Sequence, residues 1–159
     1  MDKERFCSLV REHEKSMYAF AMSILKNPDD VADCLQEAIL KAYTKLDSLK
    51  AEGKFKSWVM TIVHNCAIEI IRTKQNVIDI SECEDMSSND ADVSKKITVR
   101  DALDKLENPY RCVIFLFYYE QMPIKQIAKT TGTTEENVRT RLVRGRKMLA
   151  KTLDKESLM

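Results

Sequence analysis

The sequence contains 159 residues, enough for one ordinary domain or two small ones. Hydrophobic residues make up 44% and charged residues 32%, a globular mixture that argues against wholesale disorder. No apolar run approaches the ~20 residues of a membrane span, and the charged start, residues 1–5, lacks the apolar core of a signal peptide. The sequence therefore predicts a cytoplasmic protein.

The net charge of +1 conceals a strong segregation along the chain. Residues 1–75 carry 12 basic and 11 acidic side chains, residues 76–94 carry 6 acidic and no basic ones, and residues 95–159 carry 14 basic and 8 acidic ones. A basic carboxy-terminal part is a candidate for binding nucleic acid.

The amino-terminal part predicts three amphipathic helices. Apolar residues at three-and-four spacing share one helical face over residues 6–25, 31–46 and 55–71. Asn27 and Pro28 indicate where the second helix begins, because Asn caps helix starts and Pro suits the first turn.

The pattern breaks at residues 76–95, which are acidic, rich in Ser, Asn and Asp, and without a long apolar face. This composition is typical of a flexible linker. Helical periodicity then returns in four segments: 99–106, from Pro109 onward, 124–130 and 134–153. The sequence predicts an all-α fold of two small helical domains, 1–75 and 96–159, joined by this linker.

The strongest local pattern is a helix-turn-helix at about residues 124–143. Ala128 supplies the small residue needed where two helices cross closely, and Gly132 tolerates the positive φ of the turn. Val138 supplies an apolar anchor early in the second helix, and Thr134 is a suitable N-cap.

The second helix of this motif is strongly basic. From Arg139 to Lys151 there are six basic residues and no acid. In a major groove, Arg reaches guanine edges while Lys and Arg hold phosphates. The alternative is a solvated cationic face on an ordinary helix, and the helix-turn-helix frame favours DNA.

Two further groups of polar residues lie in the first domain. Asp33, Gln36 and Glu37 line one exposed stripe, although polar stripes are the default outer face of any helix. Aromatic and basic residues alternate from Lys54 to Trp58, a pattern that can stack on unpaired bases and hold phosphates. The alternative is that Phe55 and Trp58 pack in the core.

The five cysteines form no CxxC pair, and neither His13 nor His64 carries a local catalytic signature. This pattern predicts no disulfide framework, no zinc or other metal site and no cofactor. The sequence also lacks a glycine-rich phosphate loop, HExxH and G-x-S-x-G, which argues against an enzyme.

Three motifs in this order resemble those of an extracytoplasmic-function sigma factor of the sigma-70 family. They are DCLQEAILKAY at residues 33–43, FKSWVMTIVHNCAIEIIR at 55–72, and MPIKQIAKTTGTTEENVRTRLVRGRKML at 122–149, with an acidic linker before the third. The resemblance covers residues 6–153. It implies an alternative sigma factor whose partners are core RNA polymerase, promoter DNA and a membrane-linked anti-sigma factor.

The resemblance also implies roles for individual residues. The polymerase-binding residues would be Asp33, Gln36 and Glu37. The residues that melt and bind the minus-ten element would be Lys54, Phe55, Trp58, His64, Asn65, Glu69 and Arg72, with Asn65 in a base-capturing loop. The residues that bind the minus-thirty-five element would be Asn137, Arg139, Thr140, Val143, Arg144 and Lys147.

A second hypothesis is a stand-alone helix-turn-helix regulator with an amino-terminal dimerisation domain. Such a protein binds a palindromic site as a dimer without polymerase. Residues 54–72 discriminate between the two, because a dimerisation domain needs no aromatic and basic surface for strand melting.

Overall fold

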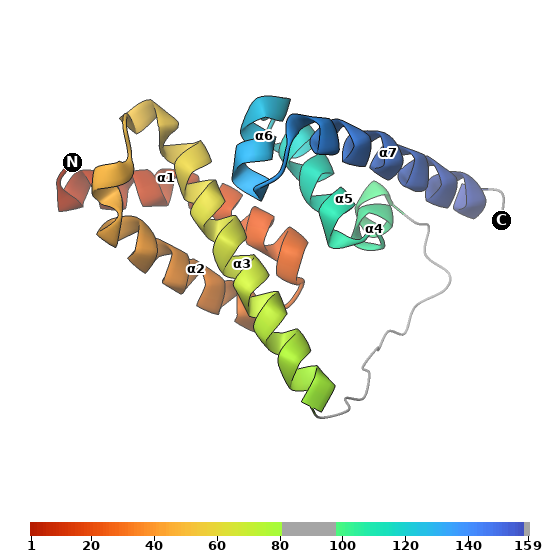
Figure 1. Cartoon of the computed structure of the whole chain (residues 1–159), viewed down its shortest axis with the longest axis horizontal. Helices are drawn as coiled ribbons and strands as arrows, with labels where there is room; N and C mark the ends of the chain where they lie inside the picture. The colour runs from red at the N-terminus through yellow and green to blue at the C-terminus, as the bar shows by residue number, and fades with distance from the viewer. Residues whose placement is uncertain (81–97, 158–159) are drawn as a thin grey trace.

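The computed structural model describes residues 1–80 and 98–157, with side chains for 1–75 and 98–154. Within these residues every regular element is a helix, and the helices form two groups (Figure 1). This confirms the predicted all-α fold with two helical domains. No described helix combines the length and apolar character needed to cross a membrane.

The first domain packs three long helices against one another. Its elements are α1 (Lys3–Leu25), α2 (Pro28–Thr44), the short 3-10 turns η1 (Leu46–Ser48) and η2 (Glu52–Lys54), and α3 (Phe55–Ile80). The start of α2 is as predicted: the Asn27 side chain accepts the N–H groups of Asp29 and Asp30 at 2.8 and 3.1 Å, and Pro28 occupies the first turn.

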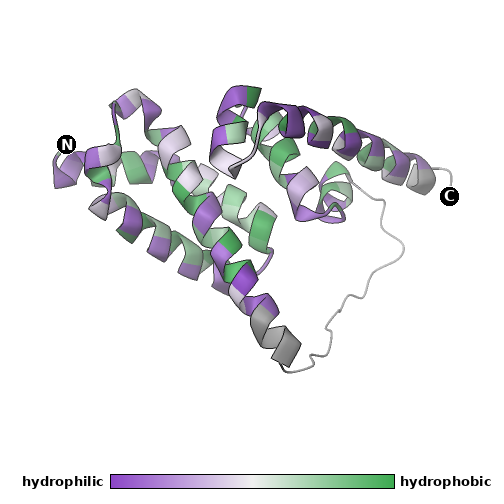
Figure 2. Cartoon of the chain, in the orientation of Figure 1, coloured by the Kyte–Doolittle hydropathy of each residue, from purple (hydrophilic) through white to green (hydrophobic). Residues whose placement is uncertain are grey.

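The second domain is built from shorter helices and one long one. Its elements are α4 (Val99–Asp104), α5 (Asn108–Ile114), the π-helical turn η3 (Phe115–Tyr119), α6 (Ile124–Thr131) and α7 (Glu135–Ser157). Hydrophobic positions concentrate on α1, α3 and α5, whereas α7 is mostly hydrophilic (Figure 2).

Gly145 explains how closely α7 approaches α5. A Cβ atom at this position would stand 2.5 Å from Cδ1 and 3.3 Å from Cγ1 of Ile114, closer than side chains normally approach. Gly145 is thus the small residue at the crossing of the two helices, which accounts for a glycine inside a helical segment.

The predicted linker, residues 76–95, lies mostly outside the described residues. Its first five residues differ from the prediction, because the backbone of α3 continues as a helix to Ile80. The sequence contains no glycine or proline between Gly53 and Pro109, so no helix breaker stops α3 at residue 75.

The two domains pack directly against each other, which the sequence did not predict. α6 lies along α3, and α1 contacts both α5 and η3 (Figure 1). One hydrophobic core runs through both domains, and Phe20 of α1 stacks on Phe115 with ring centroids 5.8 Å apart. We call this boundary the domain seam.

Three of the four described cysteines, Cys34, Cys66 and Cys112, are buried, and Cys7 is half-buried. Cys7, Cys34, Cys66 and Cys112 are free thiols, and Cys83 lies outside the described residues. Burial raises the pKa of Cys34 and Cys112, so both stay protonated and pack as small hydrophobic groups.

Candidate nucleic-acid interface

The helix-turn-helix has the local geometry that its residues predict. α6 ends at Gly132, whose φ of 70° and ψ of 36° place it in the left-handed region. The N–H of Thr133 returns to the carbonyl of Ala128 at 3.0 Å. Ala128 and Val138 are both buried, so the close crossing and the apolar anchor of the second helix are confirmed.

Threonine side chains fix the first turn of α7. Thr134 Oγ1 accepts the backbone N–H of Asn137 at 3.1 Å, which confirms Thr134 as the N-cap. The Asn137 side-chain amide donates to Thr133 Oγ1 at 2.9 Å. The Asn137 side chain is therefore oriented by the turn that precedes the helix.

One face of α7 brings together the residues predicted to bind duplex DNA. All of them are exposed: Asn137, Arg139, Thr140, Val143, Arg144 and Lys147. Spacings of three and four from Thr140 to Arg144 and Lys147 place these side chains in one row along the helix. We call this set of six residues the α7 face.

Two other basic residues of α7 contact neighbouring parts of the protein. Arg146 Nε donates to the Tyr118 hydroxyl at 2.5 Å, and its guanidinium lies 5.5 Å from the centre of the Tyr118 ring. Arg141 is half-buried and lines a cavity of about 240 Å³ at the domain seam. The basic run thus divides into the exposed row predicted to bind DNA and two residues that contact other parts of the protein.

The aromatic residues at the start of α3 belong largely to the core. Phe55 is fully buried and packs edge-on against Phe6, so its prediction as a DNA contact is wrong. Trp58 is half-buried, tilts against Phe55 and donates its Nε1–H to Ser48 Oγ at 3.1 Å. Core packing therefore accounts for Phe55 completely and for Trp58 in part.

The other predicted minus-ten residues are Lys54, at the end of η2, and residues on two sides of α3. Lys54, Asn65, Glu69 and Arg72 are exposed, and Arg72 pairs with Glu69 at 3.2 Å. The expected loop at Asn65 is wrong, because Asn65 lies within the continuous helix α3. Its surroundings contain no glycine or proline to interrupt the helix.

His64 lies on the side of α3 that faces the second domain. It is half-buried, and its ring stacks towards Phe20 with centroids 6.3 Å apart. Burial lowers the pKa of His64 below its ordinary value, the hydrogen bond with Asn65 opposes that change, and the charge of Arg141 lowers the pKa further. His64 is therefore a neutral side chain at the domain seam.

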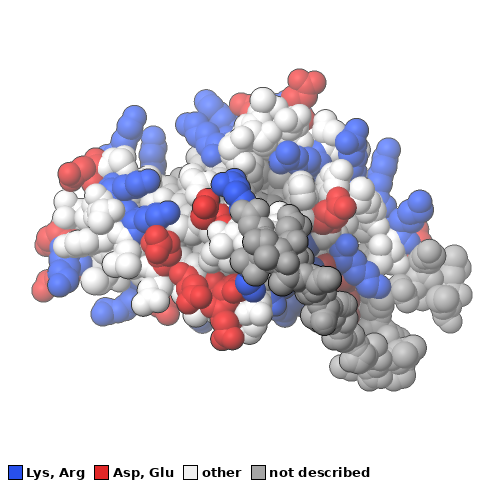
Figure 3. Space-filling view, turned by 60° about the horizontal axis from the view of Figure 1, so that its bottom comes forward, with Lys and Arg blue, Asp and Glu red and all other residues white. Residues whose placement is uncertain are grey.

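The polar stripe of α2 faces outward. Asp33, Gln36 and Glu37 are exposed, with Glu37 3.9 Å from the Lys41 amine. Leu40, one turn further, is 61% exposed and extends the stripe with an apolar side chain that the sequence interpretation missed. Acidic side chains gather at the lower left of Figure 3, where Figure 1 places α2.

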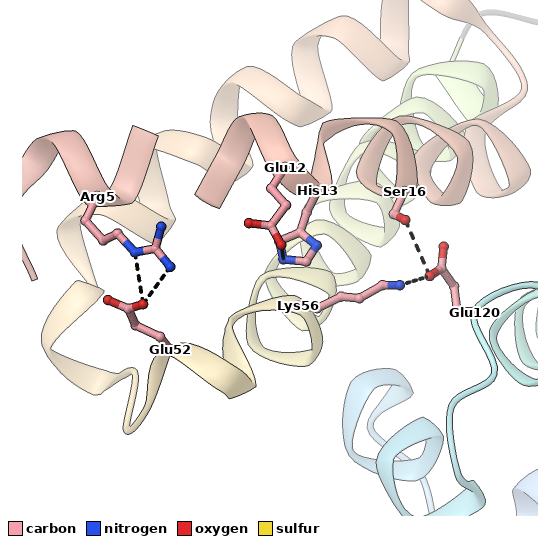
Figure 4. A network of polar contacts seen from close by, with 7 residues as sticks. All are labelled: Arg5, Glu12, His13, Ser16, Glu52, Lys56 and Glu120. Atoms are coloured by element: carbon pink, nitrogen blue, oxygen red, sulfur yellow. Dashed lines mark hydrogen bonds and ion pairs between the residues drawn. The ribbon is translucent and has the colours of Figure 1, made fainter. Parts of the chain in front are cut away.

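The sequence interpretation also missed a polar contact across the domain seam. Glu120, which follows η3, points its carboxylate at Lys56 of α3 and Ser16 of α1 (Figure 4). The sequence gives a weak indication of this contact, because Glu120 is the only acidic residue between Glu107 and Glu135. No residue near Glu120 in the sequence indicates which side chain it would contact.

Comparison with protein families assigns both halves of the chain. Residues 9–77 match the family model for sigma-70 region 2, and residues 96–149 match that for sigma-70 region 4. The chain is 32% identical to the RNA polymerase sigma factor SigV of Bacillus subtilis over 158 residues, which cover 98% of this chain and 95% of SigV. It is 28% identical to the ECF RNA polymerase sigma factor SigW of the same organism, covering 96% of this chain and 90% of SigW.

Solved structures share the fold at low sequence identity. The sigma factor RpoE of Bartonella quintana, solved in complex with the anti-sigma factor NepR, superposes with a TM-score of 0.79 at 22% identity, covering 95% of this chain and 98% of RpoE. CnrH, solved with the cytosolic domain of CnrY, gives 0.70 at 22% identity, covering 98% of this chain and 91% of CnrH. The two matched regions and the relatives that align over nearly the whole chain show its family. The chain belongs to the extracytoplasmic-function sigma factors of the sigma-70 family.

Proposed function

We propose that this chain binds core RNA polymerase and directs it to a specific set of promoters. The observation that carries the proposal is the exposed row on α7, which begins one turn after the Gly132 turn of the helix-turn-helix. Arg144 and Lys147 lie in that row, and a duplex groove lined by phosphates is the partner that such a face fits.

Each domain contributes a separate contact. The stripe of Asp33, Gln36 and Glu37 on α2 docks on the polymerase. Lys54 at the end of η2 and one side of α3, with the half-buried Trp58 and the exposed Asn65, Glu69 and Arg72, hold the unpaired minus-ten strand. The α7 face binds the minus-thirty-five duplex. Linking these contacts in one chain raises effective concentration, so modest individual affinities add up to useful selection.

The chain works by binding energy and carries out no catalysis of its own. It acts in the cytoplasm, where polymerase and promoter DNA are found. The sigma factor RpoE and CnrH, described above, were each solved with a partner protein, and the partner of RpoE is named an anti-sigma factor. We infer by analogy that an anti-sigma factor with a membrane link holds this chain inactive.

Run-off transcription with purified core polymerase on a genomic library tests this proposal. Adding the chain should produce discrete transcripts that core enzyme alone does not make. The double variant D33K/E37K should lose association with core polymerase, because the two substitutions reverse the charge of the stripe proposed to bind it. Its helical content should stay the same, because both side chains are exposed and take no part in the hydrophobic core of the chain.

A matched variant controls for charge. Lys substitutions at Glu12 and Glu14, which are exposed acids on α1, change the net charge equally and should leave co-purification intact. Co-purification of D33K/E37K at wild-type yield would remove the α2 stripe from the polymerase interface. If the chain forms a dimer that binds a palindromic site without polymerase, the hypothesis of a stand-alone regulator would replace this proposal.

A further inference from the structure

Two successive threonines hold Asn137 by its backbone and by its side chain. The Asn137 backbone N–H donates to Thr134 Oγ1 at 3.1 Å, and its side-chain Nδ2 donates to Thr133 Oγ1 at 2.9 Å. Thr133 is itself fixed beside the Gly132 turn, because its N–H donates to the carbonyl of Ala128 at 3.0 Å. The Asn137 amide therefore already has a set orientation in the free chain.

The contact with Thr133 leaves Asn137 with one donor and one acceptor for a further partner. An Asn amide carries two N–H donors on Nδ2 and one acceptor oxygen, Oδ1. Thr133 Oγ1 takes one of the two N–H groups. Asn137 is exposed, and within the part of the chain that the structure describes no hydrogen bond reaches its Oδ1.

Adenine is the base whose major-groove edge matches this pair of groups. Its N7 accepts a hydrogen bond and its N6 amino group donates one. Guanine presents two acceptors, N7 and O6, so the Asn137 Oδ1 would face an acceptor. Cytosine offers only a donor and thymine only an acceptor, and either base leaves one of the two Asn137 groups unpaired.

Asn137 also stands where a helix-turn-helix reaches the bases. The N-terminal residues of the second helix in such a motif contact base edges, and Asn137 is the third residue of α7, which begins at Glu135. Its side chain is exposed. Since the Thr133 contact has already restricted the rotamers of this side chain, binding a base costs less conformational entropy.

The charges around Asn137 favour a base edge over a phosphate as its partner. Glu135 and Glu136 precede it and are exposed acids, which repel a phosphate. Arg139, the next basic residue along α7, has its guanidinium 3.5 Å from the Glu135 carboxylate. The other exposed basic residues of the α7 face begin only at Arg144. Phosphate binding therefore suits the later turns of α7, and the first turn suits a neutral partner.

We propose that Asn137 recognises one adenine of the minus-thirty-five duplex, its Oδ1 accepting from the N6 amino group and its remaining N–H donating to N7. Thr133 is the positioning residue, because its hydroxyl determines which way the amide faces. The inference rests on the proposed function and deepens it by naming the base and the residue that sets the preference. The opposite amide orientation, with the Thr133 hydroxyl donating to Oδ1, would leave two donors and select guanine.

Selection from a duplex library tests the preference. The full chain, assembled with core RNA polymerase, binds promoters randomised across the minus-thirty-five element, and the bound sequences are counted. The wild type should favour adenine at one position by about tenfold or more, the discrimination expected of a bidentate contact. N137A should lose the preference at that position alone. If N137A alters no position, or if the position it alters holds guanine in the wild-type selection, the inference is overturned.

Variants of Thr133 test the positioning role. T133V removes the hydroxyl with little change of shape and should reduce the adenine preference to less than about threefold, because the amide is no longer oriented. T133S keeps the hydroxyl and should retain the wild-type preference. The matched control is T131V, since the Thr131 hydroxyl donates to the carbonyl of Ile127 at 2.7 Å and not to Asn137. T133V with the wild-type preference, or T131V with a reduced one, would overturn the positioning role.

A change in the DNA keeps the test decisive even if a Thr133 variant folds poorly. 7-Deazaadenine retains the N6 amino group and base pairing but has a C–H group in place of N7. At the selected position it should weaken binding of the wild type by about fivefold, the effect of one lost hydrogen bond, and leave binding of N137A unchanged. Fluorescence anisotropy measures both dissociation constants. Equal losses in the two proteins would show that Asn137 does not bind N7.

These outcomes are separable from failure of the proposed function, because the same selection is also performed with the free full-length chain. Promoter-specific transcription without an adenine preference that depends on Asn137 would overturn the base assignment alone. A chain that selects adenine through Asn137 but does not associate with core polymerase would overturn the proposed function and leave the base assignment in place.

Discussion

Arg144 and Arg146 stand two positions apart on α7 and have different surroundings. Both are exposed, but Arg144 lies in the row with Thr140 and Lys147, whereas Arg146 contacts the Tyr118 hydroxyl and ring. Formal charge and exposure therefore do not distinguish the two side chains. The contact with Tyr118 does, and it leaves Arg144 as the proposed DNA-binding residue of the pair.

Arg144→Ala should weaken binding to the preferred minus-thirty-five duplex by about 1–3 kcal/mol if the guanidinium binds a base edge. R146Q, which removes the same charge, should weaken all duplexes slightly and alike. Fluorescence anisotropy with matched and scrambled duplexes measures both. An equal loss of R144A affinity for every sequence would indicate a phosphate contact, and unchanged affinity would remove Arg144 from the site.

Asn65 is a second residue whose surroundings sharpen a prediction. It is exposed within α3, and Ala is the better helix former, so Asn65→Ala should raise stability by a few tenths to about 0.7 kcal/mol. We still expect the variant to reduce open-complex formation, because the amide can donate to and accept from an unpaired base.

Permanganate footprinting of unpaired thymines, performed beside thermal melting of the free protein, measures both effects. A stable N65A variant that opens promoters less well would assign Asn65 to strand capture. Normal footprints would show that the side chain has no part in melting.

At the scale of elements, apolar periodicity and helix caps predicted most of the fold. Asn27, Thr134 and Gly132 each act through local contacts of a few residues, which is why the sequence was sufficient for them. The π-helical turn at Phe115–Tyr119 and the contact of Glu120 were not predictable in this way. They depend on packing between segments far apart in the chain, as the Lys56–Glu120 pair illustrates.

The candidate site was predicted less evenly than the fold. The α7 face needed only helical spacing, and its six residues are all exposed. Phe55 was misassigned because an aromatic residue at the start of a helix has the same pattern whether it meets solvent or the core. The decision comes from α1, where Phe6 packs against Phe55.

The crossing of α5 and α7 allows a test of close packing. Gly145→Ala adds helix propensity worth about 1 kcal/mol, but its Cβ would meet the Ile114 side chain. We expect the clash to offset that gain, so G145A should not be stabilising. In the G145A background, Ile114→Val should lower the free energy of unfolding by less than the roughly 0.5–1.5 kcal/mol usual for this substitution. The reason is that it removes the Cδ1 atom that clashes with the new Cβ.

Chemical denaturation of the four proteins in this double-mutant cycle measures the coupling between positions 114 and 145. Additive free energies of unfolding would contradict a direct contact between Gly145 and Ile114.

At the scale of the whole molecule, the domain seam joins two units that the sequence presented as separate. Its polar contacts are few and specific, with Arg111 on Ser23 and Glu120 on Lys56 among them. The shared core around Phe20 and Phe115 makes the seam part of the folded structure rather than a surface encounter.

His64 makes the stability of this arrangement depend on pH. Burial lowers its pKa in the folded chain below the ordinary 6.5, so as pH falls the unfolded state binds the proton first. The free energy of unfolding should therefore be unaffected by His64 above pH 6.5 and should decrease below it, down to the lower pKa of the folded state. The nearby charge of Arg141 acts in the same direction.

Urea unfolding across this pH range measures the effect, and His64→Gln should flatten the decrease. The remaining slope in H64Q gives the contribution of the other titrating groups of the chain. A variant with the same pH dependence as the wild type would show that His64 does not titrate differently on folding.

The α7 face stays exposed although the two domains pack together. Under the proposed roles, the chain can touch a duplex through the row of Arg144 and Lys147 while the seam stays packed, and such phosphate contacts permit sliding along DNA. Scanning along duplex DNA thus needs no rearrangement of the seam.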